Sequence, residues 1–491
     1  MATTRPRRSW TRRARIALLV FLAVIFGGAA LVWWKFLTPG EQILADDQAA
    51  FKYGSLNGEL LAGIPYPIFM ILPRVFPDLI EKHAAAGWGP DKLRHGGYGA
   101  FGFPWEPGER LPIGFSIRKL GFERVTVNCA LCHTSSYRLT PDEQPRFALG
   151  GPGHTANVQA LLGFLFDAAQ DRRFTAARLM PEIALQFDLG WSDWALYSFV
   201  LVPATRIALR IAADQMAWTK TRPAWGPGRD DAFNLPKFVL TQSKWDDSVG
   251  NSDFPALWRM GLRDGHLMHW GGEARSVYTV VASSALGTGA TPWGDFADRN
   301  RRIEAYLRDL PPPPYPLPVD ASRAARGREI FAASCGQCHD PKGPRAGTAI
   351  PLAEIGTDPE HVKTWTQRDA DRMNKLTGFL GIENATMLAA QGYVARPLVG
   401  VWLLAPYLHN GSVPTLADLL SPPAERPAAF YRGYDVIDRD RIGFVANDHA
   451  AARRGFRFDT TLLGNGKDGH VYGVELAPDD KRALIEFLKT L

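Results

Sequence analysis

The sequence has few cysteines and, beyond its N-terminal flank, no concentrated basic stretch of the kind that nucleic acids bind. Its 491 residues include four cysteines, and no run of Lys and Arg with interleaved aromatic residues follows the first 35 residues. Residues 1–35 carry seven positive charges and no acid, so the rest of this chain of net charge +6 sums to −1. The charge reports a basic N-terminal flank, and we expect no nucleic-acid partner.

The four cysteines all lie in two Cys-x-x-Cys-His runs, at residues 129–133 and 335–339. Two thiols three positions apart lie on one face of a helical turn, so both can form thioethers to one porphyrin, and the following histidine can bind the iron. We therefore predict two covalently bound haem c groups. Their thioethers would be at Cys129, Cys132, Cys335 and Cys338, and their iron ligands at His133 and His339.

Two other uses of cysteine pairs explain this pattern less well. A four-cysteine zinc site gives no reason for a histidine to follow both pairs. A redox dithiol needs one pair and no second copy. The haem reading accounts for every cysteine in the chain.

The N-terminus predicts a membrane anchor. Six arginines among the first fifteen residues precede an uncharged run from Ile16 to Trp34, which ends at Lys35. Nineteen helical residues reach about 28 Å, close to the hydrocarbon thickness of a bilayer. Trp33 and Trp34 suit the membrane interface, and the arginines fix the N-terminus in the cytoplasm. We expect a single span in the cytoplasmic membrane of a bacterium, with the haem domains in the periplasm.

A cleaved signal peptide is the alternative to this anchor. No convincing A-x-A cleavage site follows the apolar run, which favours an uncleaved helix. The paired arginines also allow twin-arginine export. A cytochrome that acquires its haem after export does not need that route, so the general secretory path is favoured.

The chain after the anchor is long enough for two domains. We expect a mainly α protein: an Arg-rich flank and transmembrane anchor (1–40), an enlarged cytochrome-c-like domain with the first haem (41–310), a proline-rich linker (311–319) and a second cytochrome-c-like domain (320–491). Helices are expected at 321–335, leading into the second haem motif, and at 477–491. Strands are expected only as short pieces in the first domain.

The loop before the last helix contains no methionine, although methionine is a common sixth ligand of haem iron there. It does contain His470, in a glycine-rich run at 464–473 whose backbone can approach a flat cofactor closely. We predict that His470 binds the second haem iron opposite His339. The alternative is a loop histidine bonded to a carbonyl or to water.

Five short runs, at 111–116, 128–134, 268–272, 405–411 and 469–473, occur in an order that resembles the di-haem bacterial cytochrome c peroxidase superfamily. This superfamily includes the di-haem enzyme that matures methylamine dehydrogenase. The nearest resemblance is to its rubber-oxygenase-like branch, whose members have an enlarged N-terminal domain, and it covers most of residues 50–491. It implies one reactive haem and one electron-transfer haem. It also implies a calcium ion between the domains, but no run of oxygen ligands is specific enough to assign one.

The resemblance gives two residues further roles. Trp270 matches the tryptophan that lies between the two haems, where it would bridge electron exchange, although most tryptophans are simply packed for their area. His409 matches a histidine that lies near haem without binding iron, and it stays the alternative sixth ligand. Met373 and Met387 are weaker candidates that suit core packing. For the first haem, His154 and His269 are weak candidates for a distal ligand.

The chain departs from the peroxidase pattern at two places. Gly271 replaces the motif aspartate, and the run 283–289 offers no carboxylate where peroxidases have a catalytic acid. Two hypotheses follow. The first is an oxidoreductase with an open first haem that uses O2 or peroxide and a closed second haem. The second is an electron carrier with two six-coordinate haems, exchanging electrons with a quinone-linked or periplasmic partner.

Overall fold

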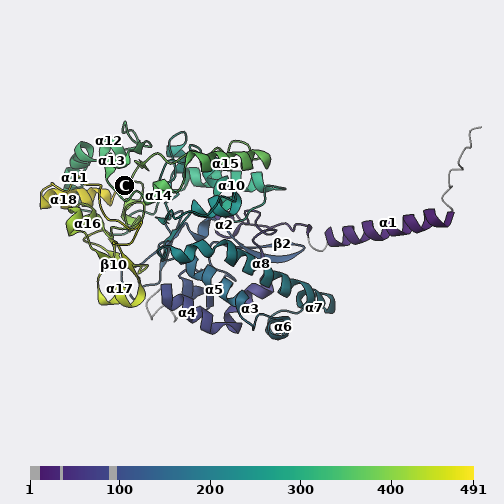
Figure 1. The fold of residues 1–491 in the computed structure, drawn as a ribbon. Helices are drawn as coiled ribbons and strands as arrows, with labels where there is room; N and C mark the ends of the chain where they lie inside the picture. The colour runs from purple at the N-terminus through teal and green to yellow at the C-terminus, as the bar shows by residue number, and fades with distance from the viewer. Residues whose placement is uncertain (1–11, 34–36, 88–96) are drawn as a thin grey trace, which may run out of the picture.

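The structure is a computed structural model that describes residues 12–33, 37–87 and 97–491, and it is mostly helical (Figure 1). The helices before the proline-rich segment are α1 (Arg12–Val32), α2 (Asp47–Tyr53), α3 (Tyr66–Val75), α4 (Pro77–Gly87), α5 (Val158–Gln170), α6 (Ala176–Ala184), α7 (Trp191–Leu196), α8 (Val202–Gln215), α9 (Val277–Gly287) and α10 (Phe296–Asp309). Those after it are α11 (Ala321–Ser334), α12 (Gly336–His339), α13 (Leu352–Ile355), α14 (Glu360–Lys363), α15 (Gln367–Phe379), α16 (Leu416–Leu419), α17 (His449–Arg454) and α18 (Pro478–Leu488).

The strands are short and antiparallel, and they occur in both halves of the chain. They are β1 (Ile64–Pro65), β2 (Phe115–Leu120), β3 (Phe122–Val127), β4 (Thr134–Tyr137), β5 (Arg146–Leu149), β6 (Arg229–Asp230), β7 (Ser252–Asp253), β8 (Ala349–Ile350), β9 (Tyr393–Val394), β10 (Ala429–Arg432), β11 (Ile437–Asp438), β12 (Gly443–Phe444) and β13 (Phe456–Asp459). One sheet has the order β1-β3-β2, and the others are pairs. The expectation of strands only in the first domain was wrong, because the long excursion after the second haem motif folds back on itself in paired segments.

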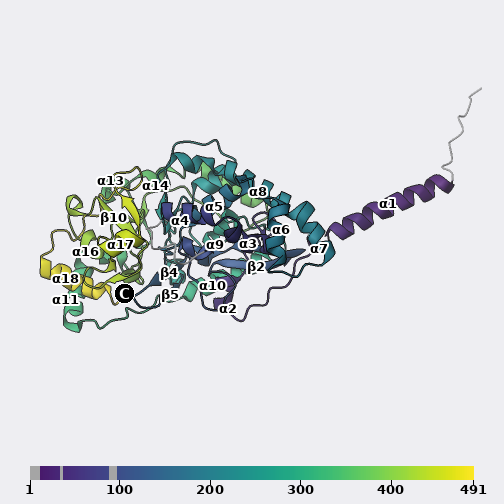
Figure 2. The same ribbon diagram turned by 90° about the horizontal axis from the view of Figure 1, so that it is seen from below.

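The predicted membrane anchor falls on α1, which projects away from the body of the protein in both views (Figures 1 and 2). Its 21 residues reach about 31 Å at the usual helical rise. Arg5, Trp34 and Lys35, which the anchor prediction also uses, lie outside the described residues. By length and composition, the helix of the described residues that could cross a membrane is Trp191–Gln215, and the apolar part of α1 is counted as a shorter helix, Arg15–Gly28. The span at α1 stays a prediction.

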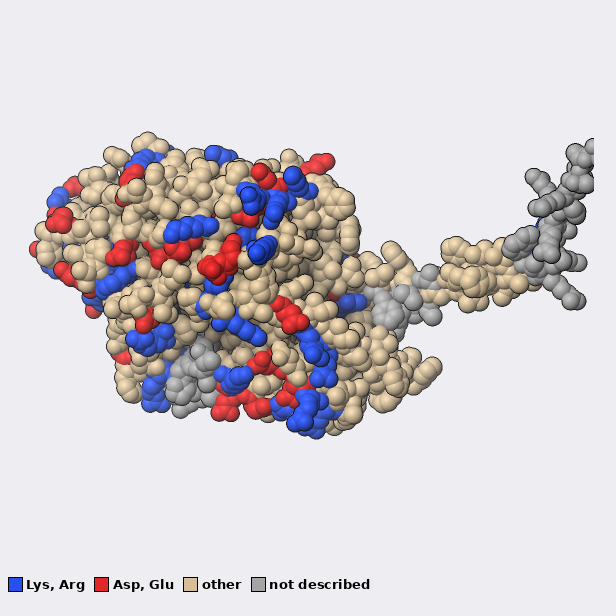
Figure 3. Space-filling model, viewed as in Figure 1, with Lys and Arg blue, Asp and Glu red and all other residues tan. Residues whose placement is uncertain are grey.

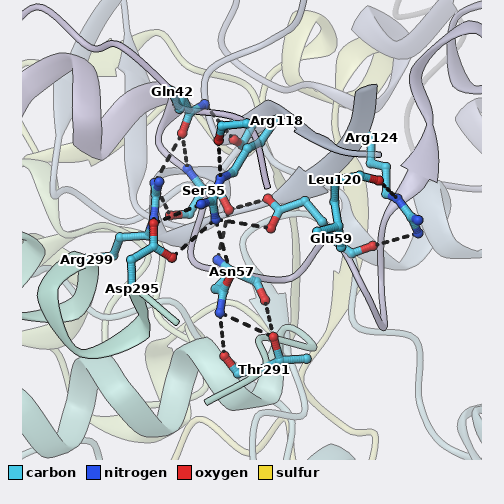
Figure 4. Close-up of polar contacts among 12 residues, drawn as sticks. Gln42, Ser55, Asn57, Glu59, Arg118, Leu120, Arg124, Thr291, Asp295 and Arg299 are labelled. Atoms are coloured by element: carbon cyan, nitrogen blue, oxygen red, sulfur yellow. Dashed lines mark hydrogen bonds and ion pairs between the residues drawn. The ribbon is translucent and has the colours of Figure 1, made fainter. Parts of the chain in front are cut away.

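The segment that follows α1 is held firmly on the body. Gly121 N donates to Thr38 O at 2.9 Å and Gly40 N donates to Lys119 O at 2.8 Å, which fixes this segment along the β2–β3 turn. Figure 4 shows the polar network beside it, in which Arg118 donates to Asp295 Oδ2 at 2.9 Å. Gln42 also donates to Ser116 Oγ at 3.0 Å. The chain is therefore held on the body at Thr38 and Gly40.

Helices α11 and α18 form the closest helix pair of the second half. Both predicted helices are confirmed: Asp320 caps α11 by accepting from Ser322 N and Arg323 N, and α18 begins at Pro478. At Gly327 the two helices approach so closely that a Cβ atom there would lie 1.9 Å from Ala483 O. Beyond this crossing, α11 ends at Cys335, the first residue of the second haem motif.

The apolar cores do not follow the proline-rich segment strictly. Met373 and Met387 are buried in one core cluster with residues of α9 and α10, so α15 packs on the first half of the chain. The proline-rich segment itself packs on the second half, where Trp402 Nε1 donates to Pro313 O at 3.1 Å. The domain boundaries stay a prediction.

Candidate functional site

The second haem motif folds as a helical turn that leaves one ring nitrogen of His339 available to a metal. Cys335 ends α11, and α12 carries Cys338 and His339. His339 Nδ1 lies 2.7 Å from Arg396 O, so this nitrogen donates to the carbonyl and Nε2 keeps its lone pair. Burial lowers the pKa of His339, which favours the neutral imidazole that a metal binds.

His470 faces His339 across this site. The two ring centroids are 6.1 Å apart with an angle of 42° between the ring planes. An iron held by two imidazoles separates their centroids by about 6 Å, since each Fe–N bond is about 2 Å and each nitrogen lies about 1 Å from its ring centre. Burial lowers the pKa of His470 to about 4, so it is neutral at pH 7. The predicted ligand pair is thus placed at the spacing that iron requires.

The loop that carries His470 is held by backbone contacts. Arg426 donates to Gly469 O at 2.8 Å and to His470 O at 3.2 Å, and His470 N donates to Ile355 O at 2.8 Å. Gly469 has φ +72°, and a Cβ atom there would lie 2.2 Å from the carbonyl carbon of Gly356. The glycine is therefore required by close approach to the backbone at Gly356. The predicted close approach of this loop to a cofactor stays a prediction.

A cavity of about 360 Å³ lies between these elements. Both cysteines of the motif border it, together with His339 and His470, and its walls include the apolar side chains Leu416, Leu420, Leu484 and Leu488. This lining suits a porphyrin that two cysteines hold by thioethers and whose iron two imidazoles could bind.

His409 also borders the cavity but is already engaged. Its Nε2 lies 2.9 Å from Tyr393 Oη, and the two rings stack with centroids 3.9 Å apart. Tyr393 donates its own proton to Asp358 O at 2.6 Å, so its oxygen accepts from His409 Nε2. This arrangement favours His470 over His409 as the iron ligand, and the assignment stays a prediction.

The first haem motif has a similar proximal histidine. Asn128 caps the short helix η4 (Cys129–Leu131) by accepting from Ala130 N at 2.9 Å. His133 Nδ1 lies 2.8 Å from Pro255 O and donates to it, which leaves Nε2 free. Burial lowers the pKa of His133 to about 4. Both proximal histidines are thus oriented by a backbone carbonyl, as iron-binding histidines commonly are.

No imidazole is seen opposite His133 at the spacing of the His339–His470 pair within the described residues. The ring at a comparable distance is the phenyl ring of Phe254, 6.2 Å away. His154 is held elsewhere, with its ring stacked on Phe444 at 3.9 Å. His269 is buried near Arg263 and Arg396, and burial together with these positive charges lowers its pKa to about 3. Its Nε2 has no hydrogen-bond partner.

Trp270 lies in the wall of the cavity at the second motif. Its Nε1 donates to Asp253 O at 2.8 Å, two residues before the carbonyl that orients His133. The guanidinium of Arg396 lies over its ring, 4.8 Å from the centroid. The indole therefore contacts the segment at residue 253 and Arg396, and its role between the two haems stays a prediction.

Arg396 joins the two proximal histidines through the backbone. Its Nη2 donates to Ala256 O at 3.0 Å, the residue after Pro255, and its carbonyl accepts from His339. A continuous path therefore runs from His133 through residues 255–256 and Arg396 to His339. The sequence reasoning missed Arg396, since a single arginine outside a motif gives no signal of such a position.

Three further buried groups were missed. Arg263 is buried beside Arg396, and burial lowers the pKa of its guanidinium to about 10. Glu273 is fully buried three residues after Trp270, where burial raises the pKa of its carboxyl to about 8. His361 has a buried Nε2 with no hydrogen-bond partner. The sequence feature that could have drawn attention to Glu273 is its place directly after Gly271 and Gly272, in the run that contains Trp270.

These residues fit haem c better than the alternatives for cysteine pairs. Among the described residues, no three His, Cys, Asp or Glu side chains are grouped to hold a metal ion by themselves, which gives a four-cysteine zinc site no support. Within the same residues, neither Arg263 nor Arg396 has a carboxylate partner at ion-pair distance. A buried guanidinium without an anion is costly, and the propionates of haem supply anions.

Comparison with known proteins agrees with this fit. Residues 392–431, which include Arg396 and His409, match the family described as RoxA-like, cytochrome c-like. Two curated proteins of Sinorhizobium fredii (strain NBRC 101917 / NGR234) are similar. "Uncharacterized protein y4iJ" is 30% identical over 40% of this chain and 44% of its own length. "Uncharacterized protein y4iM" is 32% identical over 45% of this chain and 55% of its own length.

The chain spans about half the length of these curated relatives. The matched segment is that of a cytochrome c-like domain related to the rubber-oxygenase branch, and it supports a redox protein with covalently bound haem c.

Proposed function

We propose that this protein is a membrane-anchored, periplasmic di-haem cytochrome c that acts as an oxidoreductase. The haem at Cys129 and Cys132 would be open to O2 or peroxide, and the haem at Cys335 and Cys338 would transfer electrons. The observation that carries this proposal is the asymmetry of the two histidines. His339 has a second imidazole at 6.1 Å, whereas the comparable ring near His133 is a phenyl group at 6.2 Å.

Haem c, when bound, supplies an iron that changes oxidation state and accepts a small ligand wherever one axial position is open. Pro255 O and Arg396 O orient His133 and His339, which would bind the two irons. His470, across the cavity from His339, would supply a second imidazole to the iron of the second site. Phe254, the ring that contacts His133 within the described residues, offers no donor atom to a metal.

Glu273 is a buried acid three residues after Trp270, whereas the run 283–289 offers no carboxylate. Its carboxyl holds a proton at neutral pH because burial raises its pKa to about 8. One oxygen accepts from Gly271 N at 3.1 Å, and the other, Oε1, has no hydrogen-bond partner. A buried acid of this kind can hold or release a proton near neutral pH.

The alternative is an electron carrier with two closed haems. The continuous path from His133 through residues 255–256 and Arg396 to His339 is compatible with this alternative. A carrier needs electron exchange between its two haems and no further chemistry. The proposed partner in either case is a quinone-linked or periplasmic electron donor or acceptor.

Absorption and EPR spectra of the purified protein, as isolated and after addition of O2 or peroxide, test the proposal. We expect one low-spin signal and one high-spin signal, and the high-spin signal should change on addition of an oxidant. Two low-spin signals that respond to neither oxidant would contradict the enzyme and leave the carrier.

A further inference from the structure

An exposed apolar surface covers α7, α8 and the short helix η5 (Tyr197–Leu201) between them. Trp191 is 87% exposed, Phe199 75% and Ile207 59%. Leu185, Trp194, Val200 and Ile211 are also exposed. We call these seven side chains the apolar patch.

The patch lies on helices whose opposite face is already buried. Val202, Thr205, Leu209 and Ala213 form the buried stripe of α8. Arg206 fastens this helix to α5 by donating to Ala169 O and to Asp171 O, each at 3.0 Å. The helix from Trp191 to Gln215 is therefore part of the folded body, with 33% of its most apolar window buried, although its composition would also suit a membrane span.

A helix that is apolar on both faces needs an apolar neighbour on its outer face. Isolated exposed apolar residues are ordinary, but seven on one surface are not. Tryptophan and phenylalanine are also the residues that favour the interface between a bilayer and water. In Figure 3, the end of the body from which α1 departs is largely free of charged side chains.

The patch lies beside the point where α1 leaves the body. Thr38, at the end of the connection from α1, accepts from Gly121 N at the β2–β3 turn. The next residue, Phe122, contacts Tyr197 of η5, with ring centroids 6.4 Å apart. Figures 1 and 2 agree that α7 lies at the end of the body from which α1 projects.

We propose that the apolar patch docks on the lipid bilayer that α1 anchors. The anchor confines the body to the membrane surface, and the fixed connection at residues 38–40 brings this end of the body closest to the lipid. Trp191, Trp194 and Phe199 enter the interfacial layer, as the apolar face of a surface-bound amphipathic helix does. The inference rests on the anchor in the proposed function, because α1 supplies the bilayer.

Thiol alkylation of the full-length protein tests this surface. The four native cysteines are expected to be consumed by haem, so a single introduced cysteine reports its own surroundings, and the wild-type chain is the blank. The variant is Phe199→Cys. The matched control is Phe379→Cys, since Phe379 is 88% exposed at the end of α15, on another part of the body.

Each variant is placed in phospholipid nanodiscs that hold one copy and is treated with a water-soluble maleimide. Each rate is normalised to the rate in the denatured chain. We expect alkylation at position 199 to be at least tenfold slower than at position 379. Trp191→Cys should be protected like Phe199→Cys, which keeps the test valid if one variant folds poorly.

The outcomes separate this inference from the proposed function. A chain that does not stay with the discs would contradict the anchor itself. A chain that stays with the discs but is alkylated equally fast at 199 and 379 overturns the docking surface alone. Because each disc holds one copy, protection at 199 cannot come from a second protein molecule.

Discussion

Arg396 lies over the Trp270 ring, with its guanidinium carbon 4.8 Å from the ring centroid. Both side chains hold the same short segment, since Trp270 donates to Asp253 O and Arg396 donates to Ala256 O. Between these two carbonyls lies Pro255 O, which orients His133. Trp270 and Arg396 therefore hold residues 253–256 in place. This segment orients His133 through Pro255 O, and Arg396 orients His339 through its own carbonyl.

The variant Arg396→Gln should change both haems at once. Removing a buried positive charge favours the more positive, oxidised iron, so both reduction potentials should fall. A tenfold change in each equilibrium constant corresponds to about 59 mV for a one-electron couple. A spectroelectrochemical titration that resolves the two haems measures this shift.

Two controls define the cause. Arg396→Lys keeps the charge and should stay close to the wild-type potentials. Arg345→Gln removes a cation that borders the same cavity but is paired with Glu354 at 2.6 Å, so it should affect the second haem at most. If Arg396→Gln shifts only the second haem, Arg396 does not link the two sites.

The variant His470→Ala should convert the second haem from low spin to high spin. The ring centroid of His470 lies 6.1 Å from that of His339, so if His470 binds the iron its loss would remove one of the two ligands. Haem content, measured by the pyridine haemochrome assay, should be unchanged. His409→Ala is the matched control and should remain low spin, because His409 Nε2 is bonded to Tyr393. A low-spin spectrum that survives in His470→Ala would make His470 a structural residue.

The sequence carried the local features of this site and missed the long-range ones. The two Cys-x-x-Cys-His motifs and the helices at 321–335 and 477–491 follow from short runs of residues. Arg396 and Arg263 do not, because their role depends on which backbone segments meet in three dimensions. The packing of α15 against α9 and α10 also escaped, since Met373 and Met387 carry no sign of which half of the chain they join.

Glu273 predicts a pH dependence of stability. Burial raises the pKa of its carboxyl from 4.5 to about 8, so the folded chain binds more protons than the unfolded chain between these values. The contribution of Glu273 to the free energy of unfolding is fully present below about pH 4.5 and is lost as the pH rises through about 8. Glu273→Gln should remove this loss, which amounts to as much as about 5 kcal/mol for a shift of this size.

Urea unfolding at a series of pH values from 5 to 9 measures the effect. The quantity of interest is the difference between wild type and Glu273→Gln, since other buried groups titrate in both proteins. Glu329→Gln, at an exposed ion pair, should run parallel to wild type. Parallel curves for Glu273→Gln as well would mean that the carboxyl ionises normally in the folded chain.

The crossing of α11 and α18 makes the sharpest prediction about the fold. A Cβ atom at Gly327 would lie 1.9 Å from Ala483 O, a backbone atom that a side-chain rotation cannot move. Gly327→Ala should therefore force the helices apart and destabilise the protein by about 3 kcal/mol. The matched control is Gly378→Ala in α15, where a Cβ atom meets nothing within 4 Å. That variant should be stabilised by about 0.5 to 1 kcal/mol, because alanine favours the helix and restricts the unfolded chain. Thermal unfolding of both variants decides the matter: the two substitutions should shift the midpoint in opposite directions, and a shift of the same sign would mean that the helices do not meet at Gly327.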